Sequence, residues 1–454
     1  MSYSQTAKIT SMPSLPSARR SSTAQFGKGG PAPVPGLLYY EFLPLVRRSK
    51  DTGRLEFQEF EDVLERASDW YSQVHGYRVV TLETVQFKFR DREPSERSIP
   101  TFDVSTSNPA AAKSHYYGDG LRVWLFPSEL HAAGGVELGY RDLLPRCVEK
   151  QGRSCYETVP EILERFNESQ DHGPDPLPGK IISVESRDVD EPSRSSGSRI
   201  STAVEGDVLT CYQLFSFRVF FYRGRPTRER IPTTRARPEI HDVVPKPFDY
   251  YTFEEFTEVL KRASQWLQSQ SPLRLYNVQT LFVKAKLHAP PGSVLSRKVS
   301  SLVRYLKVLR VVYSTFPEAS REFTSLQFPR CLSHRVFIPA LTVGGEDVKV
   351  AQAIRALKDK MSLWSTMLRG NILCAESLTV DFVPSGHGAD DSISTSVPSR
   401  RSSTGSQRTA RVVLYFRVYT DCPDNRAKAD SPVSMVVRPQ FHSDGEERRK
   451  CSIM

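Results

Sequence analysis

Two stretches of the chain decide its fold: FQEFEDVLERASDWYSQ at Phe57–Gln73 and its near copy FEEFTEVLKRASQWLQS at Phe253–Ser269. Both place apolar residues at helical spacing, which predicts an amphipathic helix with one buried stripe. A weaker copy, YETVPEILERFNES, begins at Tyr156, and a fourth, EDVKVAQAIRALKDKMSLW, begins at Glu346. The pattern predicts four helices, at Phe57–Tyr71, Val159–Phe166, Phe253–Leu267 and Val348–Met367.

The four copies recur at a nearly constant interval. Their equivalent leucines, taken as Leu64, Leu163, Leu260 and Leu357, are 99, 97 and 97 residues apart. A short β-type stretch ending near a proline precedes each copy, and two further β-type stretches follow it. Thr252 and Glu255 have the spacing of a capping box before the third helix. Such a period predicts an internal repeat.

The repeat predicts an α+β fold of four tandem β-α-β-β modules, each a helix packed on a small antiparallel sheet. We expect neighbouring modules to pair their sheets or pack their helices together, as repeat units do. Stretches rich in Ser, Pro, Gly and Arg predict disordered termini and loops. The expected boundaries are residues 1–36 for an N-terminal tail, 37–128 for module 1, 136–222 for module 2, 223–237 for an arginine-rich linker, 238–316 for module 3, 330–420 for module 4 and 421–454 for a C-terminal tail.

Each module also repeats an acidic or amide residue on one strand and an arginine on the next. Alternation places Glu83 on the face of Val79 and Val85, which predicts a half-buried carboxylate that needs a partner. Because such pairs recur singly in each module, we interpret them as structural. The predicted pairs are Glu83–Arg122, Glu185–Arg218, Gln279–Arg310 and Glu376–Arg417.

Composition narrows the class of protein. The net charge of +10 favours an anionic partner, either nucleic acid or an acidic membrane surface. Seven cysteines without a C-x-x-C pair indicate free thiols in a reducing compartment and no zinc site. The N-terminus has no apolar signal core, and no stretch approaches 18 apolar residues, so we expect a cytoplasmic or nuclear protein.

The sequence lacks the usual enzyme motifs. It contains no Walker A loop, no G-x-G-x-x-G after a strand and no G-x-S-x-G elbow. The nine histidines are scattered, without an H-x-x-x-H pair. We therefore predict a protein that is not an enzyme and has no catalytic residues, cofactor or bound metal.

The last four residues, Cys451-Ser452-Ile453-Met454, form a C-a-a-X box, in which methionine favours farnesylation of Cys451. They resemble the ends of prenylated proteins such as the nuclear lamins. One prenyl chain binds a membrane only weakly, so stable anchoring needs a second signal. The candidates for binding an anionic surface are Arg223, Arg225, Arg228, Arg230, Arg235 and Arg237 of the linker, and Arg448, Arg449 and Lys450 beside the box.

Two near copies, ARRSSTA and SRRSSTG, predict phosphorylation at Ser22 and Ser403, because arginines stand two and three residues before each serine. A phosphate there adds negative charge and offsets nearby basic charge. We expect phosphorylation to weaken binding to an anionic membrane.

The tandem modules, the helix pattern F-x-x-V-L-x-x-A-x-x-W and the following GYRVV resemble the repeats of the raftlin family. That resemblance implies a cytosolic, lipid-anchored protein of the plasma membrane. The family's anchor lies at an N-terminal Gly-Cys, whereas this chain begins Met1-Ser2. The prediction is a peripheral membrane scaffold with protein partners. The alternative is a basic RNA-binding repeat protein, suggested by the aromatic strand FSFRVFFYRGR.

Overall fold

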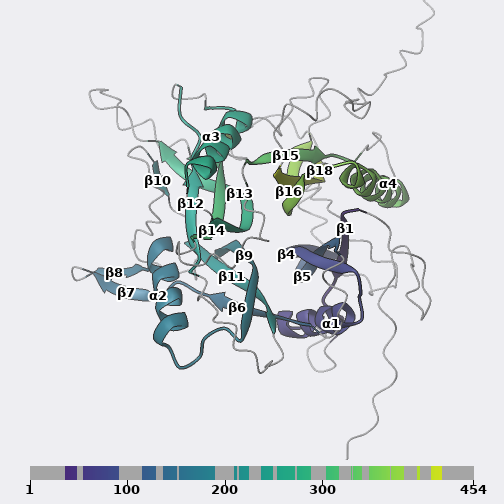
Figure 1. The fold of residues 1–454 in the computed structure, drawn as a ribbon, viewed down its shortest axis with the longest axis horizontal. Helices are drawn as coiled ribbons and strands as arrows, with labels where there is room; N and C mark the ends of the chain where they lie inside the picture. Colours follow the sequence, from purple (N-terminus) through teal and green to yellow (C-terminus); the bar gives the residue numbers. More distant parts are fainter. Residues whose placement is uncertain are drawn as a thin grey trace, which may run out of the picture. The chain divides into compact units, whose positions relative to one another are not determined.

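The fold is taken from a computed structural model of the 454-residue chain. Figure 1 shows its ribbon. The structure describes residues 36–48, 55–90, 115–128, 136–150, 153–189, 209–211, 214–223, 237–248, 253–270, 273–287, 303–315, 329, 331–339, 347–368, 370–382, 396–398 and 411–421.

Four α-helices occur in the described residues, where the repeated pattern predicts them. They are α1 (Phe60–Ser72), α2 (Val159–His172), α3 (Phe256–Ser269) and α4 (Asp347–Thr366). The predicted starts at Phe57 and Phe253 are wrong. Phe57 ends strand β3 (Leu55–Phe57), and Phe253 forms a β-bridge with Pro247, so backbone pairing delays both helices by three residues. The predicted end of α2 at Phe166 is also short, since the helix continues to His172.

The predicted capping box at Thr252 is wrong as well. Helix α3 begins after Glu255, which is its N-cap and makes no side-chain capping hydrogen bond. A capping box does exist one helix earlier, between Thr158 and Glu161 of α2. The backbone N–H of Thr158 donates to the Glu161 carboxylate at 2.7 Å, which satisfies a helix-end donor.

Helix α4 corrects the assumed period. In α3 the buried side chains Phe256, Leu260, Ala263 and Leu267 follow a 4-3-4 spacing. In α4 the same spacing joins Leu357, Met361, Trp364 and Leu368, which pack in one cluster. Met361 is therefore the counterpart of Leu260, and the third interval, from Leu260 to Met361, is 101 residues. A helix face nearly repeats after four residues, so the sequence pattern also fits one turn too early.

The strands form small antiparallel sheets, and the fold is α+β. Every sheet has the same core order, with the last of its three strands in the centre. Sheet 1 is β1 (Leu38–Phe42), β5 (His115–Pro127) and β4 (Tyr77–Arg90); sheet 2 is β6 (Glu137–Leu143), β11 (Leu214–Arg223) and β9 (Gly179–Val189); sheet 3 is β12 (Glu239–Val243), β14 (Val303–Thr315) and β13 (Leu273–Leu287); sheet 4 is β15 (Ser333–Phe337), β18 (Arg411–Asp421) and β16 (Asn371–Phe382).

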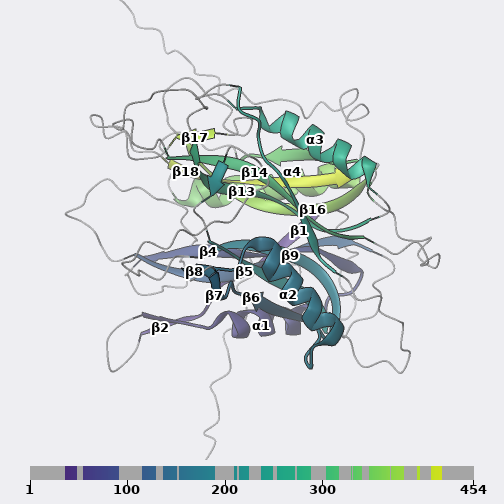
Figure 2. The same ribbon diagram turned by 90° about the vertical axis from the view of Figure 1, so that its left-hand side faces the viewer.

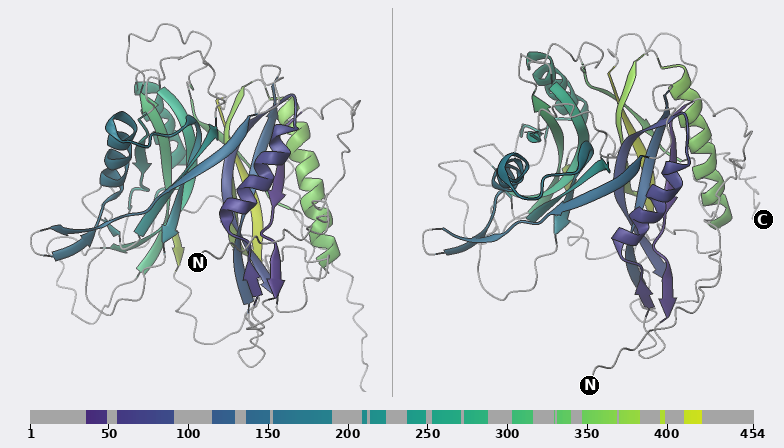
Figure 3. Two further views of the ribbon diagram at one scale, coloured as in Figure 1. Left: turned by 90° about the horizontal axis from the view of Figure 1, so that it is seen from below. Right: turned by 60° about the horizontal axis from the view of Figure 1, so that its bottom comes forward.

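Some strands lie outside this common core. Sheet 3 gains β10 (Leu209–Cys211) on β13 and β17 (Ser396–Pro398) on β14. Two hairpins precede α1 and α2, formed by β2 (Val46–Arg48) with β3 and by β7 (Cys147–Lys150) with β8 (Arg153–Tyr156). The β7–β8 hairpin projects from the rest of sheet 2 and α2 (Figure 3). The repeat pattern contains no signal for these hairpins.

The strands that follow the helices, β4, β9, β13 and β16, contact one another in a closed cycle. Strand β4 contacts β9, β9 contacts β13, β13 contacts β16, and β16 contacts β4. Figure 1 shows these four strands in the middle and the four helices around them. Figure 2 shows the sheets lying between α3 and α1. The sheets therefore meet through these strands, and the described helices do not pack in pairs.

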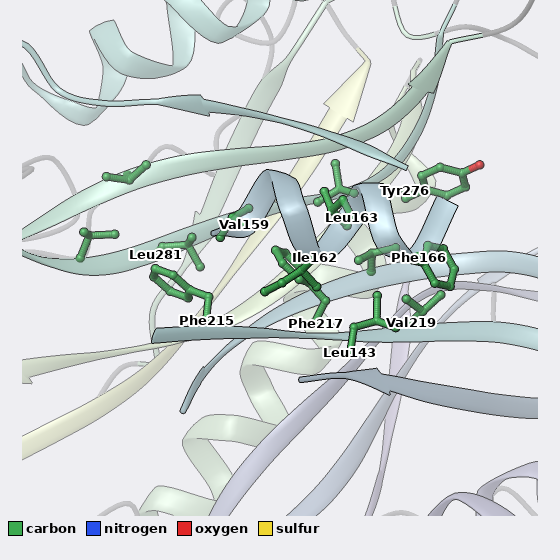
Figure 4. Close-up of a cluster of buried hydrophobic side chains, with 14 of the residues drawn as sticks. Leu143, Val159, Ile162, Leu163, Phe166, Phe215, Phe217, Val219, Tyr276 and Leu281 are labelled. Carbon is green, nitrogen blue, oxygen red and sulfur yellow. The ribbon is translucent and has the colours of Figure 1, made fainter. Parts of the chain in front are cut away.

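Each helix also reaches the first strand of the following sheet: α1 contacts β6, α2 contacts β12, α3 contacts β15, and α4 contacts β1. The hydrophobic clusters follow the same order. Ile162 and Phe166 of α2 pack with Phe217 of sheet 2 and with Tyr276 and Leu281 of sheet 3 (Figure 4). The equivalent clusters join α1 to sheet 2, α3 to sheet 4 and α4 to sheet 1. Neighbouring sheets thus share their cores.

Candidate functional site, a buried polar ring

Polar side chains from all four sheets meet where the strands of the closed cycle touch. We call this set the polar ring. It comprises Glu83, Glu185, Gln279 and Glu376, the residues that follow them (Thr84, Ser186, Thr280 and Ser377), and the arginines across each strand pair (Arg122, Arg218, Arg310 and Arg417). The four arginines are at most 4% exposed, an unusual burial for this residue type.

Backbone hydrogen bonds close the ring. In each step, the residue after one Glu or Gln donates its N–H to the Glu or Gln of the next sheet. The donations run from Thr84 to Glu185 at 2.9 Å, from Ser186 to Gln279 at 2.9 Å, from Thr280 to Glu376 at 2.7 Å and from Ser377 to Glu83 at 3.1 Å. The fourth donation returns to the first sheet. Since an unpaired buried carboxylate is costly, each sheet depends on its neighbour for a donor.

The arginines reinforce the same contacts. Arg218 Nη1 donates to Thr84 Oγ1 at 3.0 Å, and Arg310 Nη1 donates to Ser186 Oγ at 3.1 Å. Arg417 and Arg122 make the equivalent bonds to Thr280 and Ser377. Every arginine thus contacts the hydroxyl of the preceding sheet. A Ser or Thr at this position serves both bonds, because its backbone donates and its side chain accepts.

The four predicted pairs lie directly across their strand pairs in register. Two are ion pairs: Arg122 reaches Glu83 at 3.2 Å, and Arg417 reaches Glu376 at 3.3 Å. The other two arginines use different partners. Arg218 binds Asp142 with both ends of its guanidinium at 2.6 Å, and Arg310 binds Asp242 likewise at 2.7 Å.

The acidic residues of the first strands were missed by the sequence reasoning. Glu41, Asp142 and Asp242 stand opposite Arg122, Arg218 and Arg310 in register. Their spacing gave a usable signal, because each lies three residues before the proline that follows its strand. A bidentate carboxylate on the open side of a buried arginine supplies strong, charge-assisted hydrogen bonds.

Sheet 4 departs from this arrangement. Val336 stands opposite Arg417, where the other sheets carry an acid. The Nε and Nη2 atoms of Arg417 are buried and have no hydrogen-bond partner among the described residues. The guanidinium instead lies over the Phe256 ring, 4.0 Å from its centroid. Burial and the charge of Arg417 lower the pKa of nearby His334 to about 3, so this histidine is neutral.

Glu185 is the titratable member of the ring. Burial raises its pKa to about 7, although the hydroxyl of Thr84, at 2.7 Å, and the charges of Arg187 and Arg218 act in the opposite direction. The effect of burial on the Glu185 pKa exceeds these opposing effects because Arg218 forms its ion pair with Asp142. Burial likewise raises the pKa of Glu83, against the charge of Arg122.

A β-bulge explains which side chains face the ring. Strict alternation predicted Val79 on the face of Glu83, and this is wrong. The register shifts between Val79 and Thr81, so Val79 packs in the α1 cluster with Leu82. Thr81 then faces the neighbouring sheet, where its hydroxyl accepts a hydrogen bond from the N–H of Ala375 at 3.2 Å. An extra residue in one strand reverses the faces beyond it.

A second set of bonds ties each helix to the next sheet. The hydroxyls of Ser68, Ser264 and Ser365 accept the backbone N–H groups of Leu138, Leu332 and Leu37, at 2.8, 2.9 and 2.6 Å. In α2, Asn167 donates to the carbonyl of Pro238 at 3.2 Å. A residue at or just before the start of each first strand is therefore held by the preceding helix, and α4 holds sheet 1. This order supports Met361 as the counterpart of Leu260.

The other predicted sites are mostly outside the described residues: Ser22, Ser403, Arg225, Arg228, Arg230, Arg235, Arg448, Arg449, Lys450 and Cys451. Arg223 is exposed at the end of β11, and Arg237 is exposed just before β12. Arg237 forms an ion pair with Asp171 of α2, which reduces the charge it can offer to another partner.

Within the described ranges, His, Cys, Asp and Glu side chains form no group of three that could hold a metal ion. No protein-family model matches the chain, and neither the curated proteins nor the solved structures give a match. The resemblance to raftlin repeats therefore stays a prediction. Chemically, the polar ring holds four sheets together through hydrogen bonds that each sheet takes from its neighbour.

Proposed function

We propose that the chain is a lipid-anchored scaffold, built from four β-α-β-β modules that close into a single body. The observation that carries this proposal is the closed cycle of donations from Thr84, Ser186, Thr280 and Ser377. Its polar groups are committed to contacts between sheets. A body held in this way fixes the ends of its strands relative to one another, which suits the assembly of partners around it.

The common strand order supports a tandem repeat. Each helix lies in sequence between the first and second strands of its sheet, and the third strand is central in all four sheets. The ring residues occupy equivalent positions on the equivalent strands. Duplication of one module, with closure of the last copy onto the first, accounts for both features.

Attachment to a membrane rests on the C-a-a-X box at Cys451, with the linker arginines as the second signal. None of the helices in the described part is both long enough and apolar enough to cross a bilayer. A prenyl group supplies the apolar contact in this proposal, and Arg223 is an exposed cation on the body itself. The partners expected are an anionic membrane surface and proteins that bind the outer loops.

The RNA-binding alternative loses its main argument. The aromatic side chains of β11 that suggested base stacking, Phe215, Phe217, Phe220 and Phe221, are at most 4% exposed. Buried rings are not available to stack on bases. The arginines alone could still bind nucleic acid, and the nuclease treatment described next distinguishes that binding from attachment to a membrane.

The test is flotation of cell lysate with the wild-type chain, the Cys451→Ser variant and a Cys147→Ser control. Cys147 is an exposed thiol on β7 and lies outside the box. We expect wild type and control to float with membranes and Cys451→Ser to stay in the soluble fraction. Equal flotation of all three would refute the lipid anchor. If nuclease treatment releases the chain from the fraction with which it floats, the RNA-binding alternative would be favoured.

A further inference from the structure

A second layer of side chains lies five residues before the Glu or Gln of the polar ring in every sheet. The four positions hold Arg78, Lys180, Arg274 and Asn371. All four lie at the start of β4, β9, β13 and β16, the strands that contact one another in the closed cycle. Equivalent positions on neighbouring strands meet at the same end, since the ring residues of these strands also meet.

Two of these cations reach across to the next strand. Arg78 Nη2 donates to the carbonyl of Ile372 at 3.2 Å, and Arg274 Nη2 donates to the carbonyl of Ile181 at 2.7 Å. Arg274 also lies over the ring of Tyr276, 4.9 Å from its centroid. Each guanidinium is thus fixed by one nitrogen, and its other nitrogens remain as donors.

Lys180 lies between them. It stands opposite Tyr222 in register, and the hydroxyl of Tyr222 accepts the N–H of Val79 at 3.3 Å, next to Arg78. Burial lowers the pKa of Lys180, and the positive charge of Arg274 lowers it further. Burial also lowers the pKa of Arg78 and of Arg274. Lys180 and Arg274 therefore lie close enough to repel each other, and Tyr222 lies near both Arg78 and Arg274.

No carboxylate among the described residues pairs with Arg78, Lys180 or Arg274. The acids near the starts of these strands have other partners: Asp175 pairs with Arg141 at 2.7 Å, and Asp421 accepts the N–H of Cys331 at 3.0 Å. In the polar ring, by contrast, every arginine contacts at least one carboxylate. The three cations are held in place without a counter-charge.

We propose that Arg78, Lys180 and Arg274 bind a phosphate group, supplied either by free phosphate or by the headgroup of an anionic lipid. Two guanidinium groups and an ammonium match the oxygens of phosphate, and guanidinium binds such planar sets of oxygens in a bidentate manner. A bound anion offsets the repulsion between Lys180 and Arg274 and supplies a counter-charge to all three cations. All three side chains are at least partly accessible to solvent.

The experiment uses the full chain carrying Cys451→Ser, so that no prenyl group contributes. The melting temperature is measured with inorganic phosphate and with chloride at equal ionic strength. We expect phosphate to raise it by a few degrees, because a ligand that binds only the folded state stabilises it. Arg78→Gln with Arg274→Gln should abolish the rise. Arg141→Gln, at a cation already paired with Asp175, should keep it.

Lys180→Gln provides a second variant in case the double variant does not fold, since the Lys180 side chain makes no hydrogen bond or ion pair with the described residues. It should reduce the rise. No rise in wild type, or an equal rise in every variant, overturns the site. Co-sedimentation with vesicles of phosphatidylcholine alone, or with added phosphatidic acid, then identifies the source. Sedimentation that depends on phosphatidic acid and on Arg78 and Arg274 indicates a lipid headgroup, and its absence indicates free phosphate.

Discussion

Arg218 and Arg417 occupy the same place in two different sheets, but their surroundings differ. Arg218 is held by Asp142 on one side and by Thr84 on the other. Arg417 has Val336 in place of the acid, and two of its nitrogens are buried without a partner. Both guanidinium groups lie over a phenylalanine at the start of a helix that precedes their own sheet. Arg218 lies over Phe60 of α1, and Arg417 lies over Phe256 of α3.

The difference between Arg218 and Arg417 separates the role of the arginine–hydroxyl bond from the role of the first-strand carboxylate. The bond from each arginine to the hydroxyl of the preceding sheet is present in all four copies, and the carboxylate of the first strand is present in three. In sheet 4, Tyr419 compensates on the carboxylate side, because its hydroxyl donates to Glu376 at 2.7 Å. The arginine–hydroxyl contact thus reinforces the closed ring in every sheet, whereas the first-strand acid stabilises the arginine in three of them.

The largest effect is expected from Arg122→Met. This change leaves Glu83 and Glu41 buried without their cation, which typically costs about 3–5 kcal/mol. Arg417→Met should cost less, since it leaves only one carboxylate without its cation, and that carboxylate, Glu376, retains the donors from Thr280 and Tyr419. Urea denaturation of both variants measures the free energy of unfolding. Equal losses would contradict the compensation in sheet 4.

Arg141→Met is the matched control. Its partner Asp175 is largely exposed, so the loss should stay below about 1 kcal/mol. A large loss there would mean that the assay responds to any removed arginine and not to burial in the ring.

The four helices and the α+β class with small antiparallel sheets could be predicted from the sequence, because apolar spacing and β-propensity are local properties. Glu83 and Arg122 were placed opposite each other correctly for the same reason: equivalent positions recur in each copy. The partners between sheets could not be predicted. The bond from Ser377 to Glu83 joins residues 294 positions apart, and no local pattern encodes it.

Two local predictions failed for physical reasons that a single sequence does not reveal. The bulge after Val79 reversed the expected face, since alternation does not record an extra residue. The counterpart of Leu260 was assigned to Leu357, one turn before Met361, because these two side chains lie on nearly the same face of α4. In both cases tertiary contacts select between patterns that are almost equally good.

The next effect concerns pH and Glu185. The unfolded carboxyl titrates near 4.5 and the folded one near 7, so the folded state holds a proton between these values. Stability from this group is fully present below about pH 4.5 and is lost as the pH rises through 7. The loss amounts to about 1.4 kcal/mol per pH unit within that window.

Glu185→Gln should remove this slope, because its amide does not titrate. Gln279 already occupies the equivalent position in sheet 3 and accepts the N–H of Ser186. The measurement is the difference in unfolding free energy between wild type and variant from pH 5 to pH 8. Glu258→Gln, at an exposed pair on α3, is the control and should keep the wild-type slope. A parallel slope in Glu185→Gln would show that another group titrates.

The smallest effect, and the sharpest test of the comparison, is Val336→Asp. Val336 faces Arg417 in register, so the new carboxylate stands where Asp142 stands for Arg218. It should accept from Nε and Nη2, which now have no partner, and raise stability by roughly 1–2 kcal/mol after its own desolvation. Val336→Asn, without the charge, should gain less. In an Arg417→Met background the aspartate should instead destabilise, because it is left without a cation. The coupling from this double-mutant cycle isolates the new pair. If Val336→Asp lowers stability equally in both backgrounds, the unpartnered nitrogens of Arg417 do not face β15, and contacts other than a first-strand acid stabilise this arginine in sheet 4.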